Sequence, residues 1–153
     1  MEPLSVAVHS VYKLGGLRAC ESVLIFGCGP VGLLCMAVAK ALGASRIIAV
    51  DIVNSRLEFA KQYAATDIFL PPRREGGESA LDYSRRSSND LKQRLNIPDR
   101  GKDAIDLVID ASGAEVSIQT ALYAVKVGGR IIQASIYISL TKTRLTRQTG
   151  WDG

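Results

Sequence analysis

Histidine and cysteine are scarce in this chain of 153 residues, which contains one histidine and three cysteines. The cysteines, Cys20, Cys28 and Cys35, form neither a CxxC pair nor an even-numbered disulfide framework. A catalytic zinc needs three protein ligands, usually His, Cys or carboxylate, and this set of residues does not predict one. Free cysteines suit a reducing compartment, where a buried thiol packs as a small apolar group, so we expect a cytoplasmic protein.

A hydrophobic run long enough to cross a membrane is also absent. The most apolar stretch, residues 23–39, contains three glycines and a proline and is shorter than the roughly 20 residues that span a bilayer. The first residues lack the positive charge that opens a secretory signal. The net charge of +4 is small and scattered along the chain. The sequence therefore predicts neither membrane association nor nucleic-acid binding.

Apolar and helical patterns alternate along the chain. Strands are predicted at residues 22–26, 46–50, 67–70, 104–110 and 130–134, and the first, second and fourth have the continuous apolar pattern of a strand buried on both faces. Helices are predicted at residues 3–14, 31–42, 55–65, 79–95 and 115–125. Ser55 and Glu58 have capping-box spacing at the start of the third helix. Strands linked through helices predict an α/β fold, a Rossmann-type doubly wound parallel sheet.

The segment 71–103 differs from the rest because it is polar and mixed in charge. It is interpreted as a solvated loop followed by one exposed helix, rather than as a basic binding patch.

Residues 27–32, Gly-Cys-Gly-Pro-Val-Gly, match the pattern GxGxxG. The pattern alone is weak evidence, because glycine-rich turns are common. Here, however, it leaves a predicted strand and enters a predicted helix, and Asp51 follows its last glycine by 19 residues at the end of the second strand. This context predicts binding of a dinucleotide.

Each position of the motif has a physical role in that prediction. Gly27 permits the sharp turn, Gly29 lets a pyrophosphate approach the backbone, and Gly32 lets the helix pack against the strand. The amide of Val31 and the positive end of the helix dipole face the phosphates. Pro30 lacks an amide proton, which the first helical turn does not need.

Three further positions complete the candidate site. Asp51 can accept hydrogen bonds from the adenosine ribose hydroxyls and would repel a 2′-phosphate, so NAD is favoured over NADP. Arg56 either reaches the ribose edge or is a solvated side chain. Ser112 and Gly113 follow the fourth strand, at the edge where such sheets bind ligands, although Ser112 could simply cap the next helix. His9 is expected to be structural rather than a proton relay.

Four stretches resemble zinc-dependent medium-chain polyol dehydrogenases. They are EPLSVAVH (residues 2–9), FGCGPVGLLC (26–35), AVDI (49–52) and DASGAEVSIQ (110–119). The resemblance covers residues 1–129 and is strongest to the xylitol-oxidising branch (D-xylulose reductases), with sorbitol and arabinitol dehydrogenases next. It implies NAD-dependent oxidation of a secondary alcohol to a ketose, in which zinc polarises the alcohol oxygen and hydride passes to nicotinamide.

By position, the resemblance also implies roles for individual residues. Gly27, Gly29, Pro30, Val31 and Gly32 would hold the pyrophosphate, Asp51 and Arg56 the adenosine ribose, and Ser112 and Gly113 the adenosine side. Glu2 matches a glutamate that the family places beside its zinc, and is otherwise an acidic residue at a helix start. The family's main zinc ligands, a Cys and a His–Glu pair, belong to a catalytic domain that we do not expect in these residues, so zinc is not expected here.

After residues 129–132 the chain departs from the family's pattern. The family continues with a Val-Gly-x-Gly turn and a sixth strand, whereas this chain reads Gln-Ala-Ser-Ile-Tyr at residues 133–137. We expect residues 1–20 to be a hinge helix from a missing catalytic domain, 21–136 an NAD-binding Rossmann domain incomplete at the sixth strand, and 137–153 a divergent tail. The family forms homo-oligomers partly through sheet edges near this point, and the changed sequence predicts that this edge is altered.

Three hypotheses about function follow. The chain is the cofactor half of a polyol dehydrogenase, truncated and inactive by itself; or it is a non-catalytic NAD-binding module; or it is a methyltransferase that uses its glycine loop for S-adenosylmethionine. The stretch at residues 110–113 and the opening helix favour the dehydrogenase.

Overall fold

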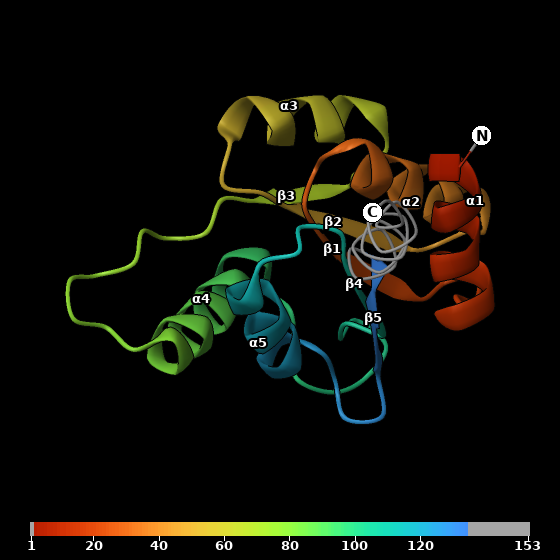
Figure 1. The fold of residues 1–153 in the computed structure, drawn as a ribbon. Coiled ribbons are helices and arrows are strands. Elements are labelled where there is room, and N and C mark those ends of the chain that lie inside the picture. Colours follow the sequence, from red (N-terminus) through yellow and green to blue (C-terminus); the bar gives the residue numbers. More distant parts are fainter. Residues whose placement is uncertain (1, 135–153) are drawn as a thin grey trace, which may run out of the picture.

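The computed structural model describes residues 2–134. They form a parallel five-stranded sheet with strand order β3-β2-β1-β4-β5, and helices cover both of its faces (Figure 1). The strands are β1 (Ser22–Phe26), β2 (Arg46–Val50), β3 (Asp67–Phe69), β4 (Leu107–Asp110) and β5 (Arg130–Gln133). The helices are α1 (Glu2–Val8), the π-helix η1 (His9–Leu14), α2 (Pro30–Ala41), α3 (Asn54–Tyr63), α4 (Ala80–Leu95) and α5 (Glu115–Ala124). The predicted α/β doubly wound fold is confirmed; the expected gap at the sixth strand and the tail at 137–153 lie outside the described residues.

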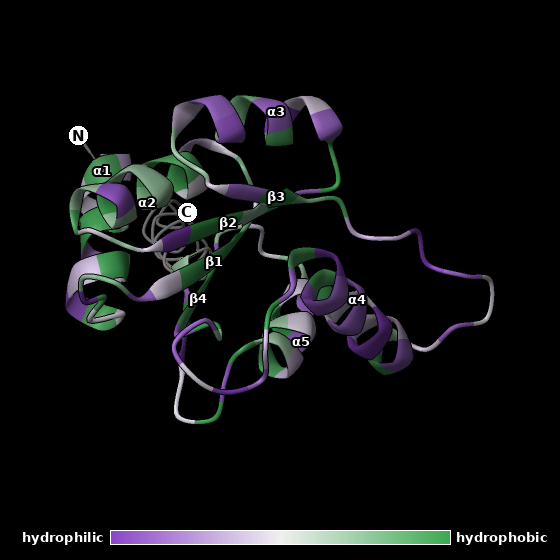
Figure 2. Ribbon diagram, turned by 180° about the vertical axis from the view of Figure 1, so that it is seen from behind, coloured by the Kyte–Doolittle hydropathy of each residue, from purple (hydrophilic) through white to green (hydrophobic). Residues whose placement is uncertain are grey.

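Two cores lie on opposite faces of the sheet. Along β1, Val23 and Ile25 pack with α1, α2 and α3, whereas Leu24 and Phe26 pack with α4 and α5. All five residues of β1 are buried, as expected for a strand covered on both faces. The strands are accordingly among the most hydrophobic parts of the molecule (Figure 2). This double burial is why continuous apolar runs gave the correct limits for β1 and β2. The strand predicted at 104–110 begins only at Leu107, and β3 and β5 are partly exposed. No helix within residues 2–134 is long and apolar enough to cross a bilayer.

The first predicted helix is present, but its second half is wider than an α-helix. Ala7 in α1 and Val11 in η1 are fully buried in the core that includes α2. The π-helix ends at Gly15, whose amide donates to the carbonyl of Ser10 at 2.9 Å. A side chain at Gly15 would press on that carbonyl oxygen and on Leu107 of the sheet. The close approach of the helix end to β4 therefore requires glycine.

The predicted capping box at the third helix is wrong. α3 begins at Asn54, so Ser55 lies inside its first turn, and the N-cap residue Val53 makes no side-chain cap. Instead, the carboxylate of Asp51 accepts the amide proton of Val53 at 2.9 Å. The turn before α3 is thus organised from the end of β2 rather than by a serine hydroxyl.

The interpretation of α4 as an exposed helix is correct for only one of its faces. Ser79 caps it by accepting the amide proton of Asp82 at 3.1 Å, and its outer face is strongly polar (Figure 2). The other face packs against α5 and buries four residues, Ser84, Ser87, Ser88 and Leu91. Because three of these are serines, the buried face carries almost no hydrophobic signal in the sequence. Small side chains allow the two helices to approach closely.

Candidate nucleotide-binding site

The carboxyl ends of β1 and β4 form the centre of the candidate site. The chain order of the sheet reverses here, with β2 and β3 on one side of β1 and with β4 and β5 on the other. Ligands of open α/β sheets bind in the crevice at such a reversal. Phe26 is in register with Asp110, so the turns that follow the two strands lie side by side. A Cβ at Gly27 would stand 2.9 Å from the amide nitrogen of Ser112. The structure therefore brings together the glycine motif and the Ser112–Gly113 turn, which are distant in sequence.

The glycines of the motif meet different surroundings. Gly27 has φ +91°, in the left-handed region that favours glycine, and it abuts the turn after β4. A Cβ at Gly32 would collide with the carbonyl oxygen of Gly27, so this glycine is required for packing of α2 against β1. Gly29 has open space around its Cβ position, with no atom within 4 Å. Of the three glycines in the motif, Gly29 therefore leaves the most room for a ligand to approach the backbone.

The helix that follows presents its amino end to this open space. Gly29 is the N-cap of α2, and Pro30 is its first residue. The amides of Val31 and Gly32 lie in the first turn, where α-helical amides have no carbonyl four residues earlier to bind. With the helix dipole, these amides make a suitable site for an anion such as a pyrophosphate.

Asp51 is tied to the glycine motif itself. Its carboxylate accepts the amide proton of Cys28 at 2.8 Å through Oδ2 and that of Val53 at 2.9 Å through Oδ1. The residue is 8% exposed, so the carboxylate lies almost covered between two backbone segments. Each oxygen keeps a further lone pair for a ligand hydroxyl. The contact with Cys28 joins residues far apart in sequence, and no local pattern predicted it.

Two residues that follow Asp51 in the chain also belong to this part of the site, and the sequence analysis named only one of them. Arg56 is an exposed residue in the first turn of α3, and its positive charge acts on the thiol of Cys28. Arg56 is thus near enough to the glycine motif for its charge to act on that thiol, and its place at the ribose edge stays a prediction. Ile52, which the sequence analysis did not single out, is 83% exposed directly after Asp51. The signal that could have identified it is an isoleucine in a turn at the ligand-binding edge.

Two of the three thiols are buried, and burial raises their pKa. It raises the pKa of Cys28 to about 12, with a further rise from Asp51 and an opposing effect of Arg56. Burial likewise raises the pKa of Cys35 to about 12. Cys20, by contrast, is exposed. The two buried thiols pack in the core between α2 and the sheet, as expected for small apolar groups.

This difference predicts the reactivity of the thiols. In the native chain at pH 8, iodoacetamide is expected to modify Cys20 alone, because the thiolate is the nucleophile and Cys28 and Cys35 stay protonated and covered. Intact mass spectrometry should show one added group without denaturant and three in urea. Cys20→Ser serves as the control and should take up none in its native state. A second group added to the native protein at a similar rate would contradict this arrangement.

Ser112 does not cap α5 in the way that its alternative interpretation requires. The N-cap residue is Ala114, which makes no side-chain cap. The hydroxyl of Ser112 accepts the amide proton of Ala114 at 3.2 Å, from two residues earlier. Gly113 has φ +72°, which a larger side chain would strain. Both residues are exposed at the edge of the sheet, where a ligand could contact them.

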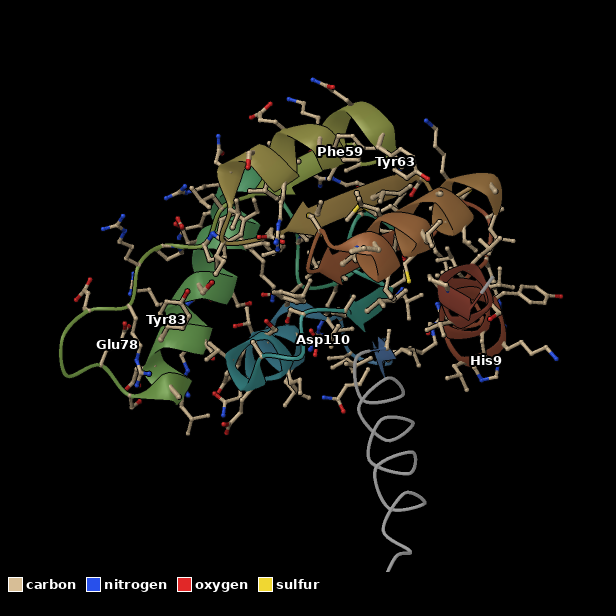
Figure 3. All side chains as sticks on the ribbon, turned by 45° about the horizontal axis from the view of Figure 1, so that its top comes forward. His9, Phe59, Tyr63, Glu78, Tyr83 and Asp110 are labelled. Atoms are coloured by element: carbon tan, nitrogen blue, oxygen red, sulfur yellow. The ribbon has the colours of Figure 1, made fainter. Side chains whose placement is uncertain are left out.

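The remaining candidates lie elsewhere. Glu2 begins α1. His9 is exposed on η1, at the outer side of the molecule and well away from Asp110 (Figure 3). Within residues 2–134 no group of three His, Cys, Asp or Glu side chains could hold a metal ion. These residues therefore do not fit the zinc that the sequence resemblance implies for the whole family.

A wide cleft lies at the opposite edge of the sheet. It measures about 820 Å³ and lies at the amino ends of β1, β2 and β3, against the end of α4. Two of its charged groups already pair with each other: Arg46 binds Asp67 at 2.9 Å and also the carbonyl of Leu95 at 2.8 Å. This pairing lowers the pKa of Asp67 and makes the cleft a structural junction rather than a nucleotide site.

Comparison with known proteins now places the chain in a family. Residues 30–147, which include most of this site, match the family model described as zinc-binding dehydrogenase. The chain belongs to this family. The resemblance seen in the sequence is thereby confirmed.

Among the curated members of the zinc-binding dehydrogenase family, fungal proteins are similar to this chain. Probable D-xylulose reductase A of Aspergillus niger is 49% identical over 138 residues, and the match covers 89% of this chain and 34% of that protein. D-xylulose reductase A of Aspergillus oryzae is 49% identical over 136 residues, with the same coverage. The chain thus spans about a third of the length of these relatives.

Solved structures of dehydrogenases share the fold. Alcohol dehydrogenase TADH from Thermus sp. ATN1 has 31% identity and a TM-score of 0.65, covering 86% of this chain and 33% of that one. The 2R,3R-butanediol dehydrogenase from Bacillus subtilis has 25% identity and a TM-score of 0.66, with the same coverage. The described residues therefore correspond to one part of a larger dehydrogenase.

Proposed function

We propose that this chain is the NAD(H)-binding part of a polyol dehydrogenase, of the type that interconverts xylitol and D-xylulose. The observation that carries the proposal is the open backbone at Gly29, which lies at the amino end of α2 and close to the anchored carboxylate of Asp51. A phosphate can approach one and a sugar hydroxyl the other. Sorbitol and arabinitol are the alternative substrates of the whole enzyme.

The site residues would share the dinucleotide as follows. The pyrophosphate would lie over Gly29 and accept the amide protons of Val31 and Gly32. The free lone pairs of Asp51 would accept the adenosine ribose hydroxyls, and Arg56 would lie at the ribose edge. A 2′-phosphate would meet the negative charge of Asp51 in a poorly hydrated position, which favours NAD over NADP.

The turn after β4 and one exposed side chain would complete the site. Ser112 and Gly113 would line the adenosine side of the crevice, and Ile52 would offer apolar surface to the flat base. Bound nicotinamide would supply the hydride acceptor for alcohol oxidation. The residues present bind and orient this group; none of them is assigned a step at the alcohol.

The domain limits form part of the same proposal. Residues 1–20 would be the hinge helix of a larger enzyme and 21–136 the cofactor domain, and Glu2 matches in position a glutamate that the family places beside its zinc. The site residues at 27–32, 51, 56 and 112–113 all fall in the second unit. The three free thiols favour a cytoplasmic location, where they remain reduced.

Calorimetric titration of the chain with NADH tests the proposal. We expect one site, with NADPH at least about 10-fold weaker because of charge repulsion at Asp51, and no competition by S-adenosylmethionine. We also expect no NAD-linked oxidation of xylitol by this chain, since its described residues do not hold a metal-ligand set. Absence of binding at millimolar NADH would refute the cofactor assignment. Oxidation of xylitol would refute the proposal that this chain binds the cofactor without catalysing the reaction by itself.

A further inference from the structure

Asp110 is a fully buried carboxylate at the carboxyl end of β4, near the centre of the molecule (Figure 3). Its Oδ1 accepts two protons from Ser112, one from the backbone amide at 3.0 Å and one from the hydroxyl at 2.7 Å. Burying a carboxylate is unfavourable unless hydrogen bonds compensate for lost hydration. The two bonds to Ser112 contribute to that compensation and fix the turn that begins at Ala111.

The hydroxyl of Ser112 continues the network away from Asp110. It accepts the amide proton of Ala114 at 3.2 Å and lies 2.9 Å from the hydroxyl oxygen of Ser117. A hydroxyl has one proton and an ionised carboxylate can only accept, so the bond to Asp110 turns the lone pairs of Ser112 toward Ala114 and Ser117. One carboxylate thereby sets the conformation of the whole connection between β4 and α5.

This connection is in direct contact with the glycine motif. A Cβ at Gly27 would stand 2.9 Å from the Ser112 nitrogen and 3.0 Å from the Ala111 carbonyl carbon. The amide of Ala111 also donates to the carbonyl of Phe26 at 2.8 Å. The turn after β4 thus packs directly against the turn after β1. A shift of one turn therefore displaces the other.

We propose that Asp110 is a positioning residue of the nucleotide site. It holds the Ser112 turn in place, so that this turn keeps its contact with the glycine motif. The inference rests on the proposed binding of NAD(H). Asp110 is fully covered and needs no contact with the ligand; it acts through Ser112 and Gly27.

Asp110→Asn in the full chain tests this role, because it keeps the shape of the side chain and removes its charge. We expect NADH affinity to fall roughly 10-fold, the size expected when a hydrogen bond to a charged group is lost. Ser112→Ala should weaken binding in the same direction, Ser112→Thr should restore it, and the double variant should be no weaker than Asp110→Asn alone. The serine variants change an exposed residue, so they carry the test even if Asp110→Asn does not fold.

Asp106→Asn is the matched control, since Asp106 is a second buried aspartate just before the same strand. It accepts the amide proton of Ser22 at 2.8 Å and forms an ion pair with Lys126, far from the carboxyl edge. This change should lower the melting temperature without altering the Kd for NADH. Equal weakening by both changes, or wild-type affinity in Asp110→Asn and in Ser112→Ala, would overturn the positioning role.

Amide hydrogen exchange separates this inference from the proposed function. If Asp110 positions the site, Asp110→Asn should speed exchange at residues 111–114 and at 27–29, and Asp106→Asn should leave both segments unchanged. Failure of the wild-type chain to bind NADH would refute the proposed function, whereas unchanged exchange at 27–29 in Asp110→Asn would refute the coupling between the two turns.

Discussion

Replacing Gly29 by alanine is expected to abolish detectable NADH binding while leaving the free energy of unfolding within about 0.5 kcal/mol of wild type. The backbone at Gly29 has φ −77° and ψ −176°, a conformation open to any residue. No atom lies within 4 Å of the added methyl group, so the folded chain accommodates it. That methyl group would occupy the space through which a pyrophosphate approaches the amides of α2. The effect therefore falls on binding rather than on folding.

Gly32→Ala is expected to give the contrasting result. Its Cβ would collide with the carbonyl oxygen of Gly27, so α2 must move away from β1. We expect loss of stability of about 1–3 kcal/mol, as for other overpacked positions, together with loss of binding. Gly76→Ala is a neutral comparison, because Gly76 lies in the remote loop before α4 and has no atom within 4 Å of its Cβ position.

Urea unfolding and NADH titration of the three glycine variants distinguish these cases. Binding by Gly29→Ala with wild-type affinity would show that the ligand does not approach the backbone there. Marked destabilisation of Gly29→Ala would show that the open space is filled in solution.

Asp51→Asn is the second change for which a large effect is expected. We predict a loss of NADH affinity of about 100-fold, corresponding to about 3 kcal/mol for two weakened hydrogen bonds to a charged acceptor. The amide nitrogen of asparagine would also face the amide of Cys28 or of Val53, both of which now donate to Asp51. Binding of NADPH should weaken far less, because the repelling charge is removed at the same time.

Glu58→Gln is the control for net charge, since Glu58 is an exposed acid on α3. It should leave the Kd values for both nucleotides unchanged. The ratio of the NADPH to the NADH dissociation constant is the decisive measurement. An unchanged ratio in Asp51→Asn would mean that Asp51 does not discriminate between the two cofactors.

The elements that local pattern located correctly are those with both faces buried. Residues 22–26 and 46–50 are strands with the predicted limits, because a strand covered by helices on both sides must be apolar at nearly every position. The glycine motif was recognisable for a related reason. At Gly27 and Gly32, a Cβ atom would collide with nearby backbone, so other residue types are excluded there.

The errors have local physical causes too. The capping box at Ser55 is wrong because the carboxylate of Asp51 holds the turn, and a hydroxyl in the first turn is not needed as a cap. The buried face of α4 was missed because Ser84, Ser87 and Ser88 are polar in sequence yet buried against α5. In the first case a carboxylate two residues away replaced the expected hydroxyl, and in the second a helix elsewhere in the chain covered polar side chains.

Neighbouring residues were enough to predict three features, since each depends on spacing along the chain. These are the order of the strands and helices, the glycine motif and the family resemblance. The seating of Gly27 against Ser112, the bond from Cys28 to Asp51 and the burial of Asp110 could not be predicted in this way. Those contacts join segments that meet only because β1 lies between β2 and β4 in the folded sheet.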